Sequence, residues 1–326
     1  MSRMKFIVLK AGTAYDMTNV TGTVKVSGRK GSAARALTAT LLDDDNYGRP
    51  RPGIDVAEGV QCLFYWDGIE RFRGIVERQQ TSQKKILTIT AHDNGIYLSN
   101  NKDTYVYSGK TASAIFSDVC KRLGLPVGEV DDTGYVIEEL PKPKTTAWDA
   151  ITDALALTYE ATGARYWPMS WEGKLRLKRR KNTILQWVIE AGANLASYTS
   201  GKSVENVKTR IKLLSDEGTV LAEATNAALE EKIGMRQDIE TPEDSLSQAQ
   251  LNELVKSVLA EKSRPEETLT ITAIGQADVI AGMGVFVRIP HLGISKTFYV
   301  ESDEHTFRQE YHSMRLNLVS AADIDS

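Results

Sequence analysis

The sequence predicts a mainly β protein with an α/β insertion, in which two tandem small β-barrels flank a helical insertion module. Three observations lead to this fold class. Short alternating strands fill the first hundred residues, amphipathic helices follow, and short strands then return toward the end of the 326-residue chain. We therefore expect a first β-barrel domain at 1–100, an α/β insertion domain at 101–195 and a second β-barrel domain at 196–326.

The first domain contains six short segments rich in Val, Ile, Thr and aromatic residues, separated by Gly, Pro, Asn and Asp. Alternation is clearest in Leu87–Ala91, where every second residue is apolar. Six strands of this kind are enough for a small barrel or sandwich. The expected strands are Lys5–Leu9, Thr21–Val26, Arg35–Leu42, Val60–Trp66, Arg71–Arg78 and Lys84–His92.

The insertion domain begins where the apolar spacing changes to that of a helix. Apolar residues within 112–123 form one stripe, which Gly124 terminates. A second helix starts at a capping box between Thr146 and Asp149 and ends before Gly163. The residues that follow return to strand composition, so this part is expected to be an α/β module.

The second β domain repeats the pattern of short strands, with one helix among them. Ser247 and Gln250 form a capping box at the start of that helix, which we place at 247–262, and Pro265 prevents its continuation. The expected strands are Val204–Leu214, Thr219–Ala224, Thr268–Ala273, Gly284–Pro290, Lys296–Ser302 and Tyr311–Val319.

The helix at 247–262 carries apolar residues at helical spacing, and these must be buried against another surface. We expect the stripe to pack on the sheet of the second barrel, with Gln248, Asn252, Glu253 and Lys256 pointing outward. The helix could also line a boundary between subunits. The candidate interface residues are Leu251, Leu254, Val255, Val258 and Leu259.

An internal repeat links the two β domains. At an offset of 225 residues, 59–76 aligns with 284–301 without a gap, and Gly68 falls on Gly293 at an expected turn. Chance similarity between two β segments is the alternative explanation. If the repeat is real, one chain contains two like barrels, and a cyclic trimer presents six of them in a ring.

Composition is ordinary for a globular protein, with 41% hydrophobic and 25% charged residues. The net charge of −3 is unevenly distributed, with +4 over 1–100, +1 over 101–200 and −8 over 201–326. This charge asymmetry suits a protein that stacks between two different neighbouring proteins, although chance variation explains it equally well.

The sequence shows neither a signal peptide nor a membrane span, so we expect no membrane insertion. Cys62 and Cys120 are expected to be buried hydrophobic residues.

Three patterns associated with binding sites are weak. Neither Gly109-Lys110-Thr111 nor Gly201-Lys202-Ser203 has the second glycine that a phosphate-binding loop requires, so an NTPase is excluded. The basic strand 174–181 is expected to form ion pairs with an acidic neighbour rather than to bind DNA, since the chain as a whole is acidic.

Histidines at 291, 305 and 312 suggest zinc, but their spacing matches no compact zinc motif. Local packing or hydrogen bonding of His305 at a hairpin is the favoured interpretation. No metal and no cofactor are expected.

Paired acids at 131–132 and 138–139 are the candidates for a glycosidase, which would suit a protein that must pass a cell wall. Adjacent residues of a strand point apart, however, and this stretch looks like a linker rich in turns, with Pro141 and Pro143 within it. Trp167 and Trp171 could stack on sugars but are more typical of a core. A cell-wall glycosidase or a glycan-binding tail module therefore remains the alternative function.

The stretch 234–319 resembles the C-terminal half of baseplate hub proteins of contractile-tailed phages and phage-like prophage particles. These PBSX-like tail hubs are related to the late-control D and spike-hub families. The similarity includes a helix, a Thr-rich strand, a strand that starts at glycine and a Ser-x-x-His-x-Phe motif, here Ser302 to Phe307. It is looser over 1–195.

This resemblance implies two tube-forming barrels, a small insertion and a homotrimeric ring that joins the sixfold tail tube to the threefold central spike. The implied partners are further copies of the chain, the tail tube protein, the spike, a wedge or LysM-type baseplate protein and a tape-measure protein in the channel. The implied location is the baseplate of a virion tail or tailocin, assembled in the bacterial host cytoplasm. We expect a structural protein with no catalytic residues.

Overall fold

The computed structural model describes residues 3–42, 56–83, 86–242 and 246–320. Contacts divide the chain into two compact units. The first unit comprises residues 1–198 and 271–318, and the second comprises residues 199–270 and 319–326. The division of the chain into three domains at residues 100 and 195 remains a prediction.

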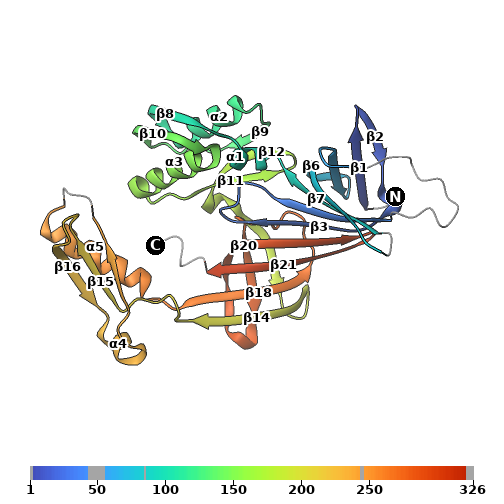
Figure 1. Ribbon diagram of the computed structural model, residues 1–326. Coiled ribbons are helices and arrows are strands. Elements are labelled where there is room, and N and C mark those ends of the chain that lie inside the picture. The colour runs from blue at the N-terminus through green and yellow to red at the C-terminus, as the bar shows by residue number, and fades with distance from the viewer. Residues whose placement is uncertain (1–2, 43–55, 84–85, 243–245, 321–326) are drawn as a thin grey trace. The chain divides into compact units, whose positions relative to one another are not determined.

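The expected mainly β architecture with a helical insertion is confirmed (Figure 1). The N-terminal strands, which we call the first β half, supply most of one buried core. The alternation predicted at Leu87–Ala91 is present, because Ile89 and Ala91 are fully buried. The strands of this half are β1 (Met4–Lys10), β2 (Thr13–Asp16), β3 (Thr21–Arg29), β4 (Ala36–Leu42), β5 (Gln61–Trp66), β6 (Ile69–Thr81) and β7 (Ile86–Asp93), with a short 3-10 turn at Thr18–Val20.

The second β half is built from strands on both sides of the second unit in the sequence. Its strands are β13 (Ile184–Glu190), β14 (Leu195–Ser203), β18 (Glu266–Ile274), β19 (Gly284–Ile289), β20 (Ile294–Arg308) and β21 (Tyr311–Ser320), with 3-10 turns at Arg180–Thr183 and Pro290–Leu292.

Strand order repeats between the two halves. The first half runs β3-β4-β7-β6-β5-β1, and the second runs β14-β18-β21-β20-β19-β13. Both segments of the predicted repeat are hairpins, β5–β6 and β19–β20, and Gly68 and Gly293 each precede the returning strand with positive φ of 79° and 68°. The two halves differ in two ways. The turn of the second hairpin is longer, since it contains a 3-10 turn. In addition, β13 pairs with β19 in parallel, whereas β1 pairs with β5 antiparallel.

The prediction of two separate closed barrels is not met by the described strands. β3, an edge of the first half, pairs with β20 over Val24–Arg29 instead of pairing with the other edge of its own half. The two halves therefore belong to one 13-stranded sheet, in which no closed barrel is found among the described strands. The physical reason is that β20, 15 residues long, reaches beyond its own hairpin and satisfies the free edge of β3.

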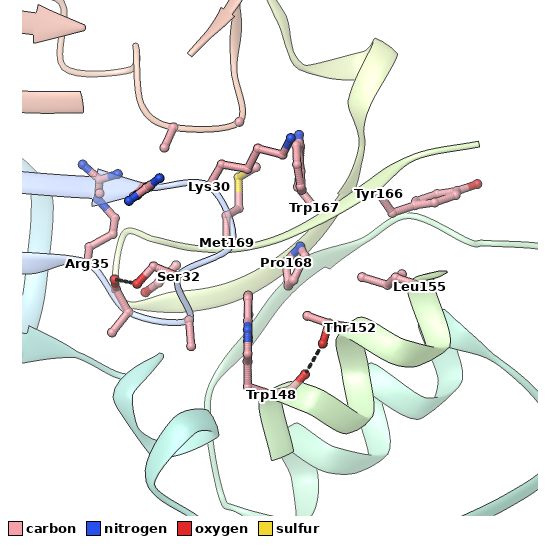
Figure 2. A pocket seen from close by; sticks show the side chains of 18 of the residues that line it. Lys30, Ser32, Arg35, Trp148, Thr152, Leu155, Tyr166, Trp167, Pro168 and Met169 are labelled. Atoms are coloured by element: carbon pink, nitrogen blue, oxygen red, sulfur yellow. Dashed lines mark hydrogen bonds between the residues drawn. The ribbon is translucent and has the colours of Figure 1, made fainter. Parts of the chain in front are cut away.

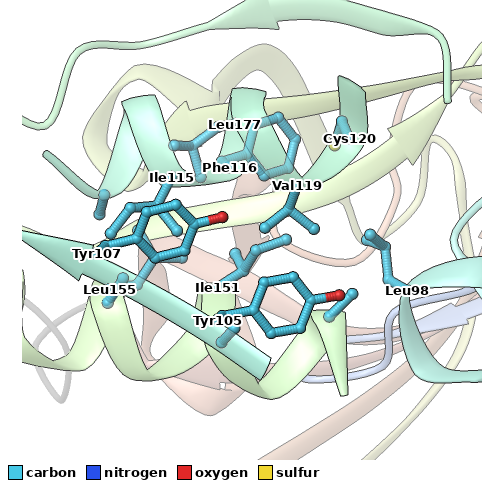
Figure 3. Close-up of a cluster of buried hydrophobic side chains, with 14 of the residues drawn as sticks. Leu98, Tyr105, Tyr107, Ile115, Phe116, Val119, Cys120, Ile151, Leu155 and Leu177 are labelled. Carbon is cyan, nitrogen blue, oxygen red and sulfur yellow. The ribbon is translucent and has the colours of Figure 1, made fainter. Parts of the chain in front are cut away.

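The insertion module packs two helices on short sheets. Its elements are α1 (Ile96–Asn100), β8 (Lys102–Thr111), α2 (Ala112–Arg122), β9 (Val127–Val130), β10 (Val136–Thr146), α3 (Ala147–Thr162), β11 (Tyr166–Trp171) and β12 (Lys174–Arg179). Thr111 and Thr146 cap the two longer helices, and Gly124 and Gly163 follow their ends in left-handed conformation, as predicted. Figure 3 shows the apolar faces of α2 and α3 meeting around Phe116, Ile151 and Tyr105.

The stretch around Pro141 and Pro143 was predicted to be a linker, and this is wrong. It forms β10, which pairs antiparallel with β8 in a sheet of only two strands. Each strand of such a sheet has one free edge, so a residue without an N–H group can face outward without a lost hydrogen bond. The prolines therefore mark an edge strand here.

The second unit has a core of its own. Its elements are β15 (Arg210–Leu214), β16 (Val220–Thr225), α4 (Ala227–Ile233), β17 (Gln237–Glu240) and α5 (Gln248–Lys262). The single strand expected at Val204–Leu214 is wrong, because β14 ends at Ser203 and β15 begins only at Arg210. The capping box at Ser247 and Gln250 is confirmed.

No helix among the described residues is long and apolar enough to cross a membrane. Cys62 and Cys120 are buried free thiols, as predicted. Burial raises the pKa of each thiol to about 12, so both behave as apolar core residues at neutral pH.

Candidate functional site

The strand pair β3–β20 is the junction at which the two β halves meet. In β20, alternate side chains point inward, so Asp303, His305 and Phe307 are buried while the residues between them are partly exposed. Phe307 enters the core of the first half, with ring centroids 4.8 Å from Phe64 and 5.0 Å from Trp66. The Ser-x-x-His-x-Phe motif is therefore the inward face of the junction strand.

A buried ion pair fastens this junction. Both terminal guanidinium nitrogens of Arg35, just before β4, donate to the carboxylate of Asp303, with Nη1–Oδ1 at 2.8 Å and Nη2–Oδ2 at 2.6 Å. The side chains are 12% and 0% exposed. The backbone N–H of Ala281 also donates to Asp303 Oδ1, at 2.6 Å. A bidentate pair in a desolvated setting fixes both distance and orientation, so it holds the first half to the second.

Gly28 makes room for this pair. It lies opposite Asp303 in the β3–β20 register. A Cβ atom at this position would lie 2.2 Å from Nη1 of Arg35 and 3.2 Å from Oδ1 of Asp303. Any side chain here would displace the guanidinium group from its carboxylate.

Two buried histidines lie beside the ion pair. His305 Nε2 is 2.9 Å from the carbonyl oxygen of Val279, so this nitrogen carries the proton and donates it. His305 Nδ1, 2.9 Å from His312 Nε2, then accepts from that N–H when both rings are neutral. His312 also stacks on Phe307, with ring centroids 4.0 Å apart, and Gly275 lies close against its ring.

This arrangement predicts that the protein loses stability in acid. Burial lowers the pKa of His305, and burial together with His305 lowers the pKa of His312 to about 3. Unfolded histidine titrates near 6.5, so the unfolded chain binds more protons below that pH, and the free energy of unfolding falls as the pH falls from about 6.5 toward 3. The charged groups that act on the pair are Asp303 and Asp67, which favour protonation, and Arg35, Arg71 and Arg3, which oppose it.

Asp93 acts in the opposite direction over part of this range. Burial raises its pKa to about 6, so between about pH 4 and 6 the folded state binds the extra proton and gains stability as the pH falls. This gain offsets the loss from one histidine. The contribution of His312 alone changes the free energy of unfolding by about 1.4 kcal/mol per pH unit between about pH 4 and 6.

Urea denaturation of wild type and His312→Gln at several pH values between 4 and 7 measures this effect. Glutamine can still donate to His305 but does not titrate, so the pH dependence of the variant should be weaker by about 1.4 kcal/mol per pH unit. The matched control is His92→Gln, which removes a partly exposed histidine paired with Glu77. Equal slopes for wild type and His312→Gln would contradict the assignment.

The structure does not bring the three C-terminal histidines together. His291 bonds to the hydroxyl group of Tyr198, away from the His305–His312 pair. Among the described residues, no group of three or more His, Cys, Asp or Glu side chains is arranged to hold a metal ion. The local hydrogen bonding predicted for His305 at a hairpin is confirmed by its bond to His312, seven residues later.

The candidate interface residues of α5 are mostly used within the second unit. Leu251, Val255 and Leu259 are buried, and Leu254 and Val258 are partly buried against the same cluster. The stripe packs on strands within 196–326, as expected, but these strands, β15 and β16, belong to a separate three-stranded sheet and not to a barrel. The expected outward residues Gln248, Asn252, Glu253 and Lys256 are exposed. The place of α5 at a subunit boundary remains a prediction.

The other candidate side chains have local structural partners. Asp131 accepts from the backbone N–H of Arg179 and from Lys178, and Asp132 accepts from Ser113 and the backbone of Gly134. Asp131 and Asp132 are thus used to hold loops, whereas Glu138 and Glu139 are exposed on β10. The basic strand β12 forms ion pairs with acidic neighbours, as predicted, through Lys178 to Glu129 and Arg176 to Glu172. Thr111 of the first Gly-Lys-Thr fragment is a helix cap.

The Arg35–Asp303 pair and Asp93 were not predicted from the sequence. The sequence does contain one indication of the pair. Asp303 lies at an inward position of an alternating strand, and the next inward residues, His305 and Phe307, carry no negative charge. A carboxylate at such a position requires a buried cation. The sequence gives no indication of which of the many arginines supplies that cation, because Arg35 lies 268 residues away.

The sequence profile of the YQBQ-like family matches residues 24–319. Two Bacillus subtilis (strain 168) proteins are similar along most of the chain. Phage-like element PBSX protein XkdQ is 34% identical over 307 residues, which cover 92% of each chain. The protein named "Uncharacterized protein YqbQ" is 34% identical over 304 residues, again with 92% of each chain covered.

Solved structures with the same fold come from phage tails and a secretion system. The 43 kDa tail protein of prophage MuSo2 from Shewanella oneidensis has a TM-score of 0.73 at 16% identity, covering 98% of this chain and 99% of that one. A tail protein from Neisseria meningitidis MC58 has a TM-score of 0.71 at 16% identity, covering 99% and 98%. The E. coli c3393 protein, a type VI secretion component described as similar to T4 tail proteins gp27 and gp5, has a TM-score of 0.53 at 8% identity, covering 92% and 73%. The chain therefore belongs to the YQBQ-like family and is a protein related to phage tails and baseplates.

Proposed function

We propose that this protein is the structural hub of the baseplate in a contractile phage-type tail or tailocin. Three copies form a ring that joins the sixfold tail tube to the threefold central spike. The role is structural, and no reaction is assigned to the chain.

The observation that carries this proposal is the repeated strand order of the two β halves. A cyclic trimer of a chain with two like halves presents six like surfaces on one side while the whole ring keeps threefold symmetry. Such a ring matches a sixfold neighbour and a threefold neighbour at once. The junction through Arg35 and Asp303 supports this role, because six surfaces match a tube only if the two halves of each chain are held at a fixed distance.

The proposed neighbours follow from the position of a hub. They are the tail tube protein on one side, the central spike on the other, a wedge or LysM-type baseplate protein outside and a tape-measure protein in the channel. We also place helix α5 at a subunit boundary. Since Leu251, Val255 and Leu259 are already buried in their own unit, the contact would be made through partly buried Leu254 and Val258 and the exposed face.

Native mass spectrometry and electron microscopy of the assembled baseplate test the ring. The expected result is a closed ring with a central channel that contains three copies of the 36.0 kDa chain. Assembled particles are needed, because an isolated subunit at low concentration can dissociate. A dimer or a hexamer of this chain in the assembled baseplate would exclude the proposed symmetry match.

A further inference from the structure

A pocket of about 300 Å³ lies within the first unit, between the β3–β4 connection, helix α3 and strand β11. Figure 2 shows Trp148 and Leu155 on its helical side, Trp167 and Met169 on the strand, and Lys30 reaching along Trp167. The Lys30 Nζ atom is 4.7 Å from the centroid of the Trp167 ring. The wall is therefore largely aromatic and apolar, which is typical of a pocket that takes a bulky apolar group.

Positive charge surrounds this apolar wall. The lining residues include Arg29, Lys30, Arg35 and Arg165, and none of the described residues that line the pocket is acidic. Asp303 neutralises Arg35, and the carboxylate of Glu301 lies 3.8 Å from Lys30 Nζ. An excess of cations remains. Burial lowers the pKa of Lys30, Glu301 raises it, and the neighbouring cations Arg180 and Arg165 lower it further.

Two buried donors of the lining residues have no hydrogen-bond partner among the described residues. They are Nε of Arg165 and Nε1 of Trp167. The guanidinium group of Arg165 is otherwise held in place, since it lies 3.9 Å over the Tyr159 ring and donates to the Tyr159 hydroxyl group at 2.6 Å. A buried donor without an acceptor is costly, and a carboxylate from a ligand would satisfy it.

Strand β11 gives the pocket a backbone edge. It is the outer strand of the sheet β11-β12-β9 and pairs only with β12 among the described strands. Residues 165–170 line the pocket without interruption. A free strand edge can pair with an extended peptide, whose backbone supplies the missing hydrogen bonds while its side chains enter the adjacent pocket.

We propose that this pocket docks a short acidic peptide segment of a neighbouring tail protein. The segment lies along β11, places one large aliphatic or aromatic side chain against Trp148 and Trp167, and directs flanking carboxylates to Lys30, Arg29 and Arg165. Charge complementarity and the free edge select this class of ligand. The inference goes beyond the proposed ring and does not depend on trimer formation.

Selection from a random displayed peptide library on the purified full chain tests the pocket without a known partner. The expected consensus is an apolar residue flanked by Asp or Glu. A synthetic peptide of that consensus should bind in calorimetry, and its Asn/Gln counterpart should bind about tenfold more weakly or worse. No enrichment, or a consensus without acids, would overturn the proposal.

Charge reversal locates the binding. The double variant Lys30→Glu/Arg165→Glu should lose peptide binding, whereas Lys110→Glu/Lys121→Glu, with the same charge change at exposed positions of the insertion module, should bind like wild type. Because Arg165 also packs on Tyr159, folding of each variant is checked by thermal unfolding. Arg29→Glu changes an exposed residue at the rim of the pocket. If the double variant does not fold, weaker peptide binding by Arg29→Glu is the expected result that tests the pocket instead. Binding that is unchanged in Arg29→Glu and in every folded reversal variant means that the peptide binds elsewhere.

The same peptide distinguishes the source of the docked segment. Residues 321–326 read Ala-Ala-Asp-Ile-Asp-Ser, an apolar residue between two acids. A chain ending at Ser320 should bind the peptide as the full chain does if a neighbouring protein supplies the segment. At least tenfold tighter binding to the shortened chain would show that its own terminus competes for the pocket, which would overturn the assignment to a neighbour.

Discussion

Asp303→Asn is expected to destabilise the first unit by about 3–5 kcal/mol, because it removes the carboxylate that pairs directly with the buried guanidinium group of Arg35. Arginine does not lose its proton in proteins, so the group cannot become neutral to avoid this cost. An asparagine side chain has only one oxygen, so it can accept only one of the two hydrogen bonds that Arg35 donates to Asp303. The loss is measured as the change in free energy of unfolding in urea, at a pH near 7 where the buried histidines are neutral.

The adjacent residue provides a matched control. Glu304 pairs with Lys25 at 3.0 Å on the same two strands, but both side chains are nearly half exposed. Glu304→Gln should therefore change the free energy of unfolding by less than about 1 kcal/mol. If Asp303→Asn costs no more than Glu304→Gln, the buried pair does not hold the two β halves together.

A double replacement separates the cost of an orphaned charge from the value of the pair. Arg35→Met with Asp303→Leu removes both charges and keeps apolar volume, so it should regain part of the stability that Asp303→Asn loses. Recovery will be incomplete, since the N–H of Ala281 loses its acceptor. A double variant that is less stable than the single one would mean that the carboxylate acts mainly on the backbone at Ala281.

Val255→Asp is expected to unfold the second unit. Val255 is 2% exposed and packs in the cluster of Ile211, Leu213 and Ala222, so the new carboxylate would be buried without a partner. The expected loss is about 4 kcal/mol or more, which a unit with so small a core cannot tolerate. Limited proteolysis should then cut within 199–270, while the first unit, which has separate cores, should resist.

Position 252 supplies the control on the same helix. Asn252→Asp adds a carboxylate to the exposed face, so it should leave both proteolysis and thermal unfolding near the wild-type result. Leu254→Asp should fall between the two, because Leu254 is only partly buried. Equal protease resistance of Val255→Asp and Asn252→Asp would mean that the stripe does not form the core of this unit.

Helix boundaries were predicted closely because the signals that set them are local. Thr111, Thr146 and Ser247 each accept a hydrogen bond from the backbone N–H three residues later, and the caps at Thr146 and Ser247 are evident in the sequence. The glycines after α2 and α3 act through their own positive φ. Such features involve only a few neighbouring residues, so the order of amino acids is sufficient to locate them.

The repeated hairpins were also visible in the sequence, since a turn glycine and alternating strands recur at a fixed offset. Strand pairing between distant segments was not visible. Alternation shows which face of β20 is buried but contains no information on which edge pairs with which strand. The expected closed barrels therefore became one sheet through β3 and β20, and the expected linker at Pro141 and Pro143 became an edge strand.

The sequence by itself determined the mainly β composition, the helical insertion with its caps, the turn glycines Gly68 and Gly293 and the apolar stripe of α5. Only the tertiary structure decided that Asp303 meets Arg35, that His305 meets His312 and that Lys30, Arg165 and Trp167 surround one pocket. The physical reason is the distance along the chain over which each kind of interaction acts. Propensity, capping and periodicity act over a few residues, whereas a buried charge selects its partner by position in space, after the strands have paired.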